Sequence, residues 1–396
     1  MGASILQMPV SGYGREPAGM SVTILPDPLV LRPRSMRVVR QTIRFCTSQD
    51  GVRLAFGVHG DGPPLVRVAT WLTHLQYDWD SPLWRHWLDG LAAGRTLVRY
   101  DERGSGLSDR DVSRISLDAW VDDLEAVVDA AGLEQFSLLG LSNGGAIAVA
   151  YAVRHPERVS NLVLCGAFAQ GRLRRDPSSD ARAEADALLA MIRTGWGRAN
   201  PAFRRAFTTL FVPDATHEQM GWFDELQRIS ATPETAALMR LAREEIDITD
   251  LVPQVVTPTL AFHAHDDAAV PFEQGRALAS GIPRARFVPL DGRNHILLAD
   301  EPAWEVFLRE LDAFVPRRSS DDDIADELLT ARETEVLEHV AAGMTNDMIA
   351  RELFVSVRTV ERHLGNMYRK LGLHGKSGRA AIAARAASLI HTHPES

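Results

Sequence analysis

A serine that could act as a nucleophile lies in the stretch LGLSNGG, residues 139–145, where an apolar run gives way to a run of helix-forming residues. Small flanking residues let such a strand-to-helix turn close and hold the hydroxyl of Ser142 exposed. The hydroxyl becomes a nucleophile when a base takes its proton and a carboxylate orients that base. Because the chain has 29 glycines, the G-x-S-x-G pattern arises by chance in about one such chain in ten. The pattern indicates a nucleophile only if the sequence also offers a base and a carboxylate for Ser142.

Two candidate partners follow apolar runs farther along the chain. Asp267 comes after the run at 260–263, and His295 comes after the run at 287–290. Reactive groups of parallel sheets collect on the loops at the carboxyl ends of the strands. The sequence therefore offers a hydroxyl, a carboxylate and an imidazole on three such loops.

The elements that must position these residues are short apolar runs, most of them separated by helical segments. Such alternation predicts an α/β fold with a mostly parallel sheet covered by helices on both faces. Two earlier runs alternate with period two and are joined by Gln49, Asp50 and Gly51, which favours an antiparallel hairpin. The runs are 42–46, 52–56, 65–70, 96–100, 136–140, 162–165, 260–263 and 287–290.

The chain order Ser, Asp, His resembles that of the α/β-hydrolase fold. The loop YDERGSGLSD at 100–109 and the Asp-x-x-Val-Pro pattern ending at Pro271 strengthen this resemblance, which extends over residues 41–315. It implies that Ser142 is the nucleophile, His295 the base, and Asp267 the acid that orients the imidazole. The interpretation in which Ser142 only serves the turn and His295 is a packed residue stays open.

The resemblance also implies donors for a developing oxyanion. The backbone N–H of Asn143 is one by position. We expect the second in the loop around 73–76, at Gln76, although Leu75 stands where the family usually has glycine.

The segment at about 169–257 has aromatic residues at helical spacings and is expected to form a helical cap over the sheet edge. Such aromatics are usually core, but a cap over Ser142 would also enclose an apolar site. We expect a small, mostly apolar ligand there, such as an ester or a lactone. The expected ligand-binding residues are His74, Leu75, Trp196, Trp222 and Phe223.

Composition limits the class of protein. The 396 residues carry a formal charge of −9, and no run approaches the ~20 apolar residues of a membrane span. Cys46 and Cys165 lie in apolar runs, which favours reduced thiols in a cytoplasmic protein over a disulfide or a metal site. No metal and no cofactor are expected. Residues 1–35 lack a secretory pattern and are expected to be a disordered segment before a domain at 36–315.

After an expected linker at 316–325, the pattern of residues 326–396 is helical. A capping box begins at Thr330, Thr345 and Ser356 precede two further helices, and a fourth helix is expected at about 378–389. The third helix carries an apolar stripe opposite a basic face. Between 357 and 385 there are seven Lys or Arg against one acid, which indicates an anionic partner.

Three motifs closely resemble the LuxR/GerE-type helix-turn-helix domain: LTARETEVL at 329–337, GMTNDMIA at 343–350, and VRTVERHL at 357–364 followed by RKLG at 369–372. This resemblance implies DNA binding in the major groove. Domains of this type usually bind DNA as dimers, so we expect a homodimer. By it, Glu361, Arg362 and Gly365 face bases. The residues expected to meet phosphates are Arg358, Arg369 and Lys370.

The two resemblances together predict a transcriptional regulator whose hydrolase-fold domain senses a small molecule, with DNA and that effector as partners and no role for a membrane. One alternative is an active serine esterase or lactonase coupled to a DNA-binding domain. Another is a constitutive regulator with a decayed hydrolase domain.

Overall fold

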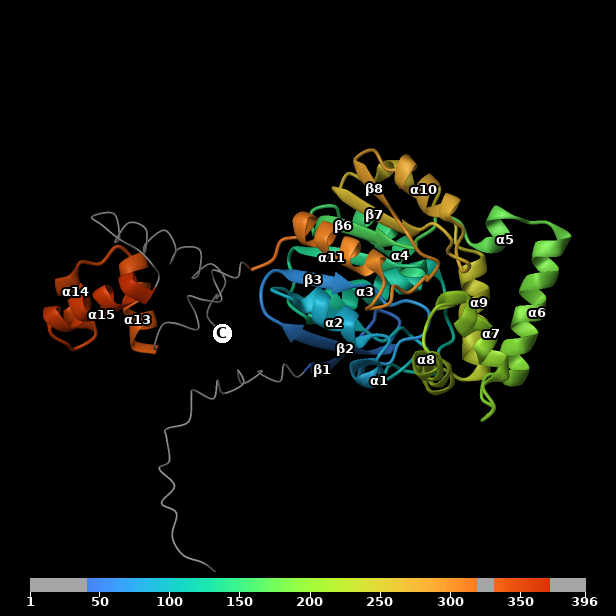
Figure 1. Ribbon diagram of the computed structural model, residues 1–396, viewed down its shortest axis with the longest axis horizontal. Coiled ribbons are helices and arrows are strands. Elements are labelled where there is room, and N and C mark those ends of the chain that lie inside the picture. Colours follow the sequence, from blue (N-terminus) through green and yellow to red (C-terminus); the bar gives the residue numbers. More distant parts are fainter. Residues whose placement is uncertain (1–40, 319–330, 371–396) are drawn as a thin grey trace, which may run out of the picture. The chain divides into compact units, whose positions relative to one another are not determined.

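A computed structural model describes residues 41–318, here called the large domain, and residues 331–370, the small domain. Each domain is considered by itself (Figure 1). Several sequence expectations lie outside the described residues: the segment 1–35, most of the linker, the capping box residue Thr330 and the fourth helix.

The large domain is built on one eight-stranded sheet in the order β1-β2-β4-β3-β5-β6-β7-β8. The pairs β1·β2 and β2·β4 are antiparallel, and all pairs from β4 to β8 are parallel. The predicted hairpin and mostly parallel sheet are therefore confirmed. The strands are β1 (Thr42–Thr47), β2 (Arg53–Gly60), β3 (Pro64–Arg67), β4 (Thr96–Tyr100), β5 (Phe136–Leu141), β6 (Val159–Cys165), β7 (Thr259–Ala264) and β8 (Ala285–Leu290).

Helices cover both faces of the sheet, and β5 shows why, since all six of its residues are buried. Phe136 and Leu138 join one core, with α3 and α4, while Leu139 and Leu141 join the other, with α2 and α11. Successive strand residues point to opposite faces, so a strand buried on both sides must be apolar throughout. The flanking helices are α1 (Leu75–Asp80), α2 (Arg85–Ala92), α3 (Leu117–Ala130), α4 (Asn143–Arg154), α10 (Phe272–Gly281) and α11 (Pro302–Phe314).

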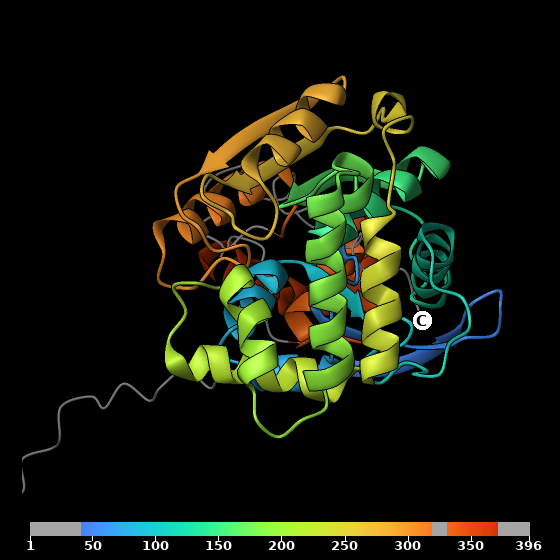
Figure 2. The same ribbon diagram turned by 90° about the vertical axis from the view of Figure 1, so that its right-hand side faces the viewer.

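Between β6 and β7 the chain forms a helical layer, here called the cap, at the expected place. Its helices are α5 (Arg172–Arg175), α6 (Ser179–Gly195), α7 (Ala202–Phe211), α8 (His217–Ser230) and α9 (Pro233–Glu244). The long helices α6 and α9 lie side by side (Figure 2). Trp196 and Phe207 belong to the hydrophobic core of the cap. Trp71, from the loop after β3, joins this core and packs against Trp196 at the end of α6 and against Arg243 of α9.

One buried ion pair ties the cap to the sheet. Arg243 of α9 donates to both carboxylate oxygens of Glu102, at 2.5 and 2.6 Å, in the loop after β4. Its guanidinium also lies 5.0 Å from the ring centroids of both Trp71 and Trp120. Burial raises the pKa of the Glu102 carboxyl to about 7, although Arg243 opposes that rise. Removing one partner of such a pair leaves a buried charge without compensation.

The small domain packs three helices around one core. They are α13 (Ala331–Ala341), α14 (Asn346–Glu352) and α15 (Val357–Lys370). Thr345 and Ser356 cap the second and third helices as predicted, accepting from the backbone N–H groups of Met348 and Thr359 at 3.3 and 3.1 Å. The core consists of Val336, Leu337, Val340, Ile349, Ala350, Val360, Leu364 and Met367. Throughout both described domains, every helix is too short or too polar to cross a membrane.

The Glu102–Arg243 pair yields a stability prediction. Arg243→Ala should lower the free energy of unfolding by about 3 to 5 kcal/mol, because Glu102 stays buried without its partner. The loss should grow as the pH rises above about 7, because the Glu102 carboxyl of the folded wild-type protein then ionises beside Arg243, whereas in the variant it must ionise unpaired or stay protonated. Urea unfolding at pH 5.5 and pH 8 measures both effects.

The matched control is Arg276→Ala, which removes an exposed pair with Glu273 and should change stability by less than about 1 kcal/mol at either pH. An Arg243→Ala loss no larger than that of the control, or one independent of pH, would show that the pair does not anchor the cap.

Candidate active site

Ser142 occupies a strained turn between β5 and α4. Its φ of 51° and ψ of −126° lie where residues with a side chain are rare. Its backbone N–H donates to the carbonyl of Cys165 at 2.9 Å. A Cβ on Gly145 would lie 2.3 Å from the Cβ of Ala167, and one on Gly140 would lie 2.6 Å from the Cα of Gly145. The glycines of the motif therefore permit the close packing that forces Ser142 out of the strand.

His295 and Asp267 form the second part of the site. Their Nδ1 and Oδ2 atoms are 2.6 Å apart, and both residues are 7% exposed. The other carboxylate oxygen of Asp267 accepts from the backbone N–H groups of Ala269 and Val270 at 2.9 and 3.0 Å. Burial opposes ionisation of Asp267, but the charge and hydrogen bond of His295 outweigh it and lower the pKa of the carboxyl. Such a carboxylate can orient an imidazole and stabilise its cation.

The structure brings the three predicted residues together at the carboxyl edge of the sheet. Ser142 and His295 line one narrow recess with Phe223 of the cap. A second histidine, His263, also lies at Asp267. Its Nε2 is 3.5 Å from the same carboxylate oxygen that contacts His295. This arrangement has the parts needed to activate the serine hydroxyl.

The expected oxyanion donors are placed differently. As the first residue of α4, Asn143 has a backbone N–H without an intrahelical acceptor. The loop between β3 and α1 offers the N–H of Trp71 as the second donor. This N–H, however, donates to the side-chain Oδ1 of Asn143 at 3.1 Å. The hydroxyl of Thr70 donates to the same oxygen at 3.0 Å. The side chain of Asn143 thus takes the loop donor that an oxyanion would need.

This geometry corrects the expectation for Gln76, which is exposed on α1. His74 caps that helix, accepting from the N–H of Tyr77 at 3.4 Å, and the N–H of Leu75 donates to the Asp101 carboxylate at 3.0 Å. Because these bonds fix the segment as a helix, none of His74, Leu75 and Gln76 lines the cavities at Ser142.

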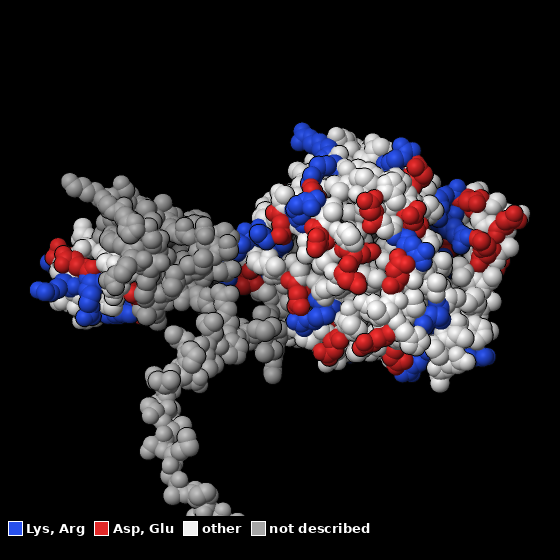
Figure 3. Space-filling model, viewed as in Figure 1, with Lys and Arg blue, Asp and Glu red and all other residues white. Residues whose placement is uncertain are grey.

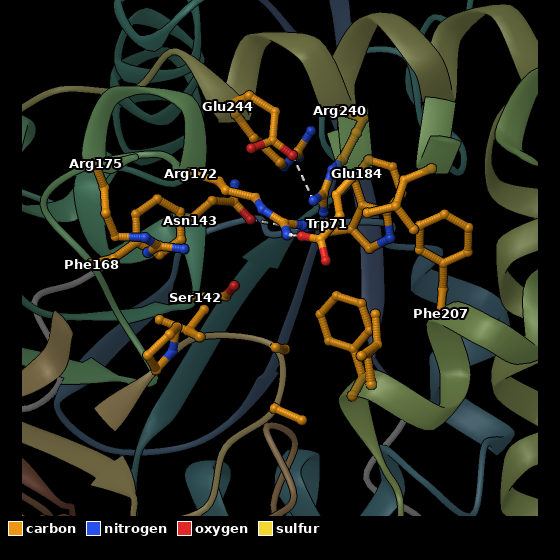
Figure 4. Close-up of a pocket in the computed structure, with 18 of the residues that line it drawn as sticks. Trp71, Ser142, Asn143, Phe168, Arg172, Arg175, Glu184, Phe207, Arg240 and Glu244 are labelled. Carbon is orange, nitrogen blue, oxygen red and sulfur yellow. Dashed lines mark hydrogen bonds and ion pairs between the residues drawn. The ribbon is translucent and has the colours of Figure 1, made fainter. Parts of the chain in front are cut away.

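A cavity of about 500 Å³ lies above Ser142, between the sheet edge and the cap. Part of the lining is apolar, as expected, and includes Phe168, Leu188, Phe207 and Phe211. The charged part of the lining was not expected: it comprises Arg172, Arg175, Arg240 and Arg243 with Glu184 and Glu244 (Figure 4). The run RLRR at 172–175, which forms α5 in the segment after β6, is the sequence signal for that charge.

The expected aromatic ligand contacts are met only in part. Phe223 lines the recess that contains Ser142 and His295. Trp196 is 1% exposed inside the cap core, with its ring 5.7 Å from that of Trp71, and Trp222 packs on Tyr77 at 4.7 Å. Neither tryptophan lines the two cavities at Ser142, because both are used in helix packing. In the described chain, no three His, Cys, Asp or Glu side chains gather as a metal site.

Comparison with known proteins identifies both domains. A model of the alpha/beta hydrolase fold family matches residues 63–302. The chain belongs to this family. A second model, for bacterial regulatory proteins of the luxR family, matches residues 327–383. The large domain is thus an α/β-hydrolase domain. The small domain is the described part of a LuxR-family DNA-binding domain.

Relatives with known names match the hydrolase domain. The candidate carbamate hydrolase RutD of Azorhizobium caulinodans is 30% identical over 255 residues, which are 63% of this chain and 90% of that protein. The 2-hydroxymuconate semialdehyde hydrolase of Pseudomonas sp. strain CF600 is 30% identical over 250 residues, 58% of this chain and 75% of that protein. Among solved structures, an esterase from Thermogutta terrifontis has a TM-score of 0.55 at 26% identity, covering 69% of this chain and 99% of the esterase.

The LuxR-family domain presents the predicted face of α15. Arg358, Glu361, Arg362 and Gly365 are exposed, while Val360, Leu364 and Met367 are buried. Both basic and acidic side chains are visible on the uncovered part of this domain and over the hydrolase domain (Figure 3). Arg369 and Lys370 belong to the last turn of α15, but their side chains lie outside the described residues.

The Asn143 contact gives a prediction about turnover. Asn143→Ala frees the N–H of Trp71, so hydrolysis of p-nitrophenyl acetate should rise at least tenfold, given that one oxyanion donor is worth about 10² to 10³ in rate. Asn143→Asp keeps an acceptor at the same place and should show no rise. Ser142→Ala added to Asn143→Ala should abolish the gain. Unchanged or lower turnover in a folded Asn143→Ala protein would contradict the assignment of Trp71 as the loop donor.

The exposed face of α15 gives a prediction about DNA. Arg362→Ala should weaken specific binding more than non-specific binding, because a base contact is worth about 1 to 3 kcal/mol. Arg358→Ala should weaken both and reduce the slope of log affinity against log salt by about one. Gel shifts at several salt concentrations measure both effects, and the reverse pattern would mean that the two arginines have exchanged roles.

Proposed function

We propose that this protein is a transcriptional regulator whose α/β-hydrolase domain binds a small molecule and thereby changes the affinity of its LuxR-family domain for DNA. Two findings motivate the proposal: a DNA-binding domain on the same chain, and a cavity of about 500 Å³ over Ser142. We further propose that it acts as a homodimer, as domains of this type usually do.

The observation that favours a receptor over an enzyme is the contact between Asn143 and Trp71. Hydrolysis requires preorganised donors where negative charge develops. Here the N–H of Trp71 and the hydroxyl of Thr70 are already satisfied by the Asn143 side chain. A site arranged in this way binds a carbonyl compound beside Ser142 without strongly stabilising the transition state for its hydrolysis.

The second candidate is an active serine hydrolase, an esterase or a lactonase, coupled to a DNA-binding domain. The 2.6 Å contact between His295 and Asp267 favours it. So do the names of the relatives, which include a semialdehyde hydrolase and an esterase. A hydrolase of this kind would remove the ligand that the receptor only binds.

The cap offers a means of coupling. Arg240, Arg243 and Glu244 of α9 line the cavity, and Arg243 also holds the cap to Glu102. A ligand changes DNA affinity only if it binds two conformations of the protein differently. Contacts with α9 make the ligand bind the two conformations differently if the cap position differs between the DNA-bound and the free protein. Coupling of this type typically changes the affinity for DNA about 5- to 150-fold.

The test uses full-length protein and genomic fragments that it enriches. Anisotropy titrations with and without p-nitrophenyl butyrate and N-hexanoyl homoserine lactone, alongside turnover assays, should give a shift in DNA affinity that Ser142→Ala retains. Leu188→Trp, which fills the cavity, should abolish the shift and leave binding of the unliganded protein unchanged. Rapid hydrolysis of either compound, with no shift in DNA affinity for Ser142→Ala, would instead establish the hydrolase.

A further inference from the structure

Among the arginines that line the cavity, Arg175 is the one without an ion pair in residues 41–318. Arg172 pairs with Glu184, Arg240 with Glu244 at 2.5 Å, and Arg243 with Glu102 at 2.5 Å. Both carboxylates that line the cavity are therefore used. Within residues 41–318, the side chain of Arg175 makes no hydrogen bond and no ion pair, although it is only partly exposed.

Arg175 is placed to meet a ligand. It is the last residue of the short helix α5, and its side chain runs past Phe168 toward the space over Ser142 (Figure 4). A guanidinium keeps its charge at any pH that a protein experiences. Partial burial of a charge is unfavourable unless an opposite charge accompanies it. An anion that enters the cavity would supply the ion pair that Arg175 lacks.

A second unpartnered donor lies near Ser142. Asn143 is 2% exposed and lines the cavity, and its side-chain Nδ2 has no hydrogen-bond partner. The amide orientation is set by the N–H of Trp71, which can only donate and therefore requires Oδ1 at that place, and the hydroxyl of Thr70 donates to the same oxygen. The NH₂ group must face away from them, so a buried donor awaits an acceptor on the ligand.

We propose that the ligand is a small monocarboxylate with a second carbonyl group a few carbons away. Its carboxylate pairs with Arg175, its carbonyl oxygen accepts from Asn143 Nδ2 beside Ser142, and its apolar chain lies against Phe168, Phe211 and Val270. This assignment replaces the mostly apolar ligand expected from the sequence. It rests on the proposed function in taking this cavity as the effector site.

The charge count favours a carboxylate over a phosphate. One arginine is unpaired among the described lining residues, and two carboxylates, those of Glu184 and Glu244, belong to the same lining. A phosphate monoester carries close to two negative charges at neutral pH. Its second charge would face these acids without a further free cation. A guanidinium instead pairs with one carboxylate through two parallel hydrogen bonds.

The experiment compares acids with their neutral esters. Binding of the monomethyl and dimethyl esters of adipic, suberic and sebacic acid to full-length Ser142→Ala protein is measured by calorimetry. For at least one chain length, the monomethyl ester should bind about tenfold or more tightly than the dimethyl ester, as expected for one charge-assisted hydrogen-bonded pair. Arg175→Met should remove this preference, and Arg174→Met, at an exposed neighbour paired with Glu245, should keep it.

Equal affinity for acid and ester, a preference that survives Arg175→Met, or binding by no acid of the series would each overturn the proposal. A stronger affinity for phenyl phosphate than for every acid, lost in Arg175→Met, would overturn the carboxylate assignment. DNA anisotropy on the same samples separates the two proposals. A charge preference without any shift in DNA affinity refutes the regulator function alone, and a DNA shift caused equally by acids and esters refutes only the carboxylate site.

Discussion

The backbone conformation of Ser142 is the constraint around which the hydrolase domain is organised. A φ of 51° on a residue with a side chain persists only where its surroundings hold it. Here β5 is buried on both faces, α4 starts at the next residue, and Gly145 lies against Ala167 where a Cβ would not fit. The sheet and both cores therefore serve to hold one hydroxyl at the floor of the cavity.

The residue that follows the serine decides how that hydroxyl is used. In this fold the N–H after the nucleophile and an N–H from the loop after β3 together stabilise an oxyanion. Asn143 supplies the first, but its side chain accepts from Trp71, which supplies the second. The Nδ2 of the same amide is buried without a hydrogen-bond partner, and Asn143 lines the cavity. A geometry suited to recognition of a carbonyl oxygen thus replaces part of a geometry suited to catalysis.

The sequence predicts what depends on local pattern and fails where distant segments meet. Ser142, Asp267 and His295 were found because each follows a short apolar run, and the buried stripe of α15 was found from its spacing. The donor at Gln76 was wrong, because the start of α1 depends on contacts such as that of Leu75 with Asp101. The free charge of Arg175 was not predictable either, since it depends on which arginines find acids, and Arg243 finds Glu102 across 141 residues.

The loop after β4 connects the cap to the rest of the hydrolase domain. Its three consecutive charged residues each hold a different element: Asp101 accepts from the N–H of Leu75 on α1, Glu102 binds Arg243 of the cap, and Arg103 binds Asp123 of α3. These groups are almost fully buried, so their bonds either form together or leave charges uncompensated. In the proposed regulator, a ligand that contacts α9 would therefore act on a cap whose anchoring bonds form or break together.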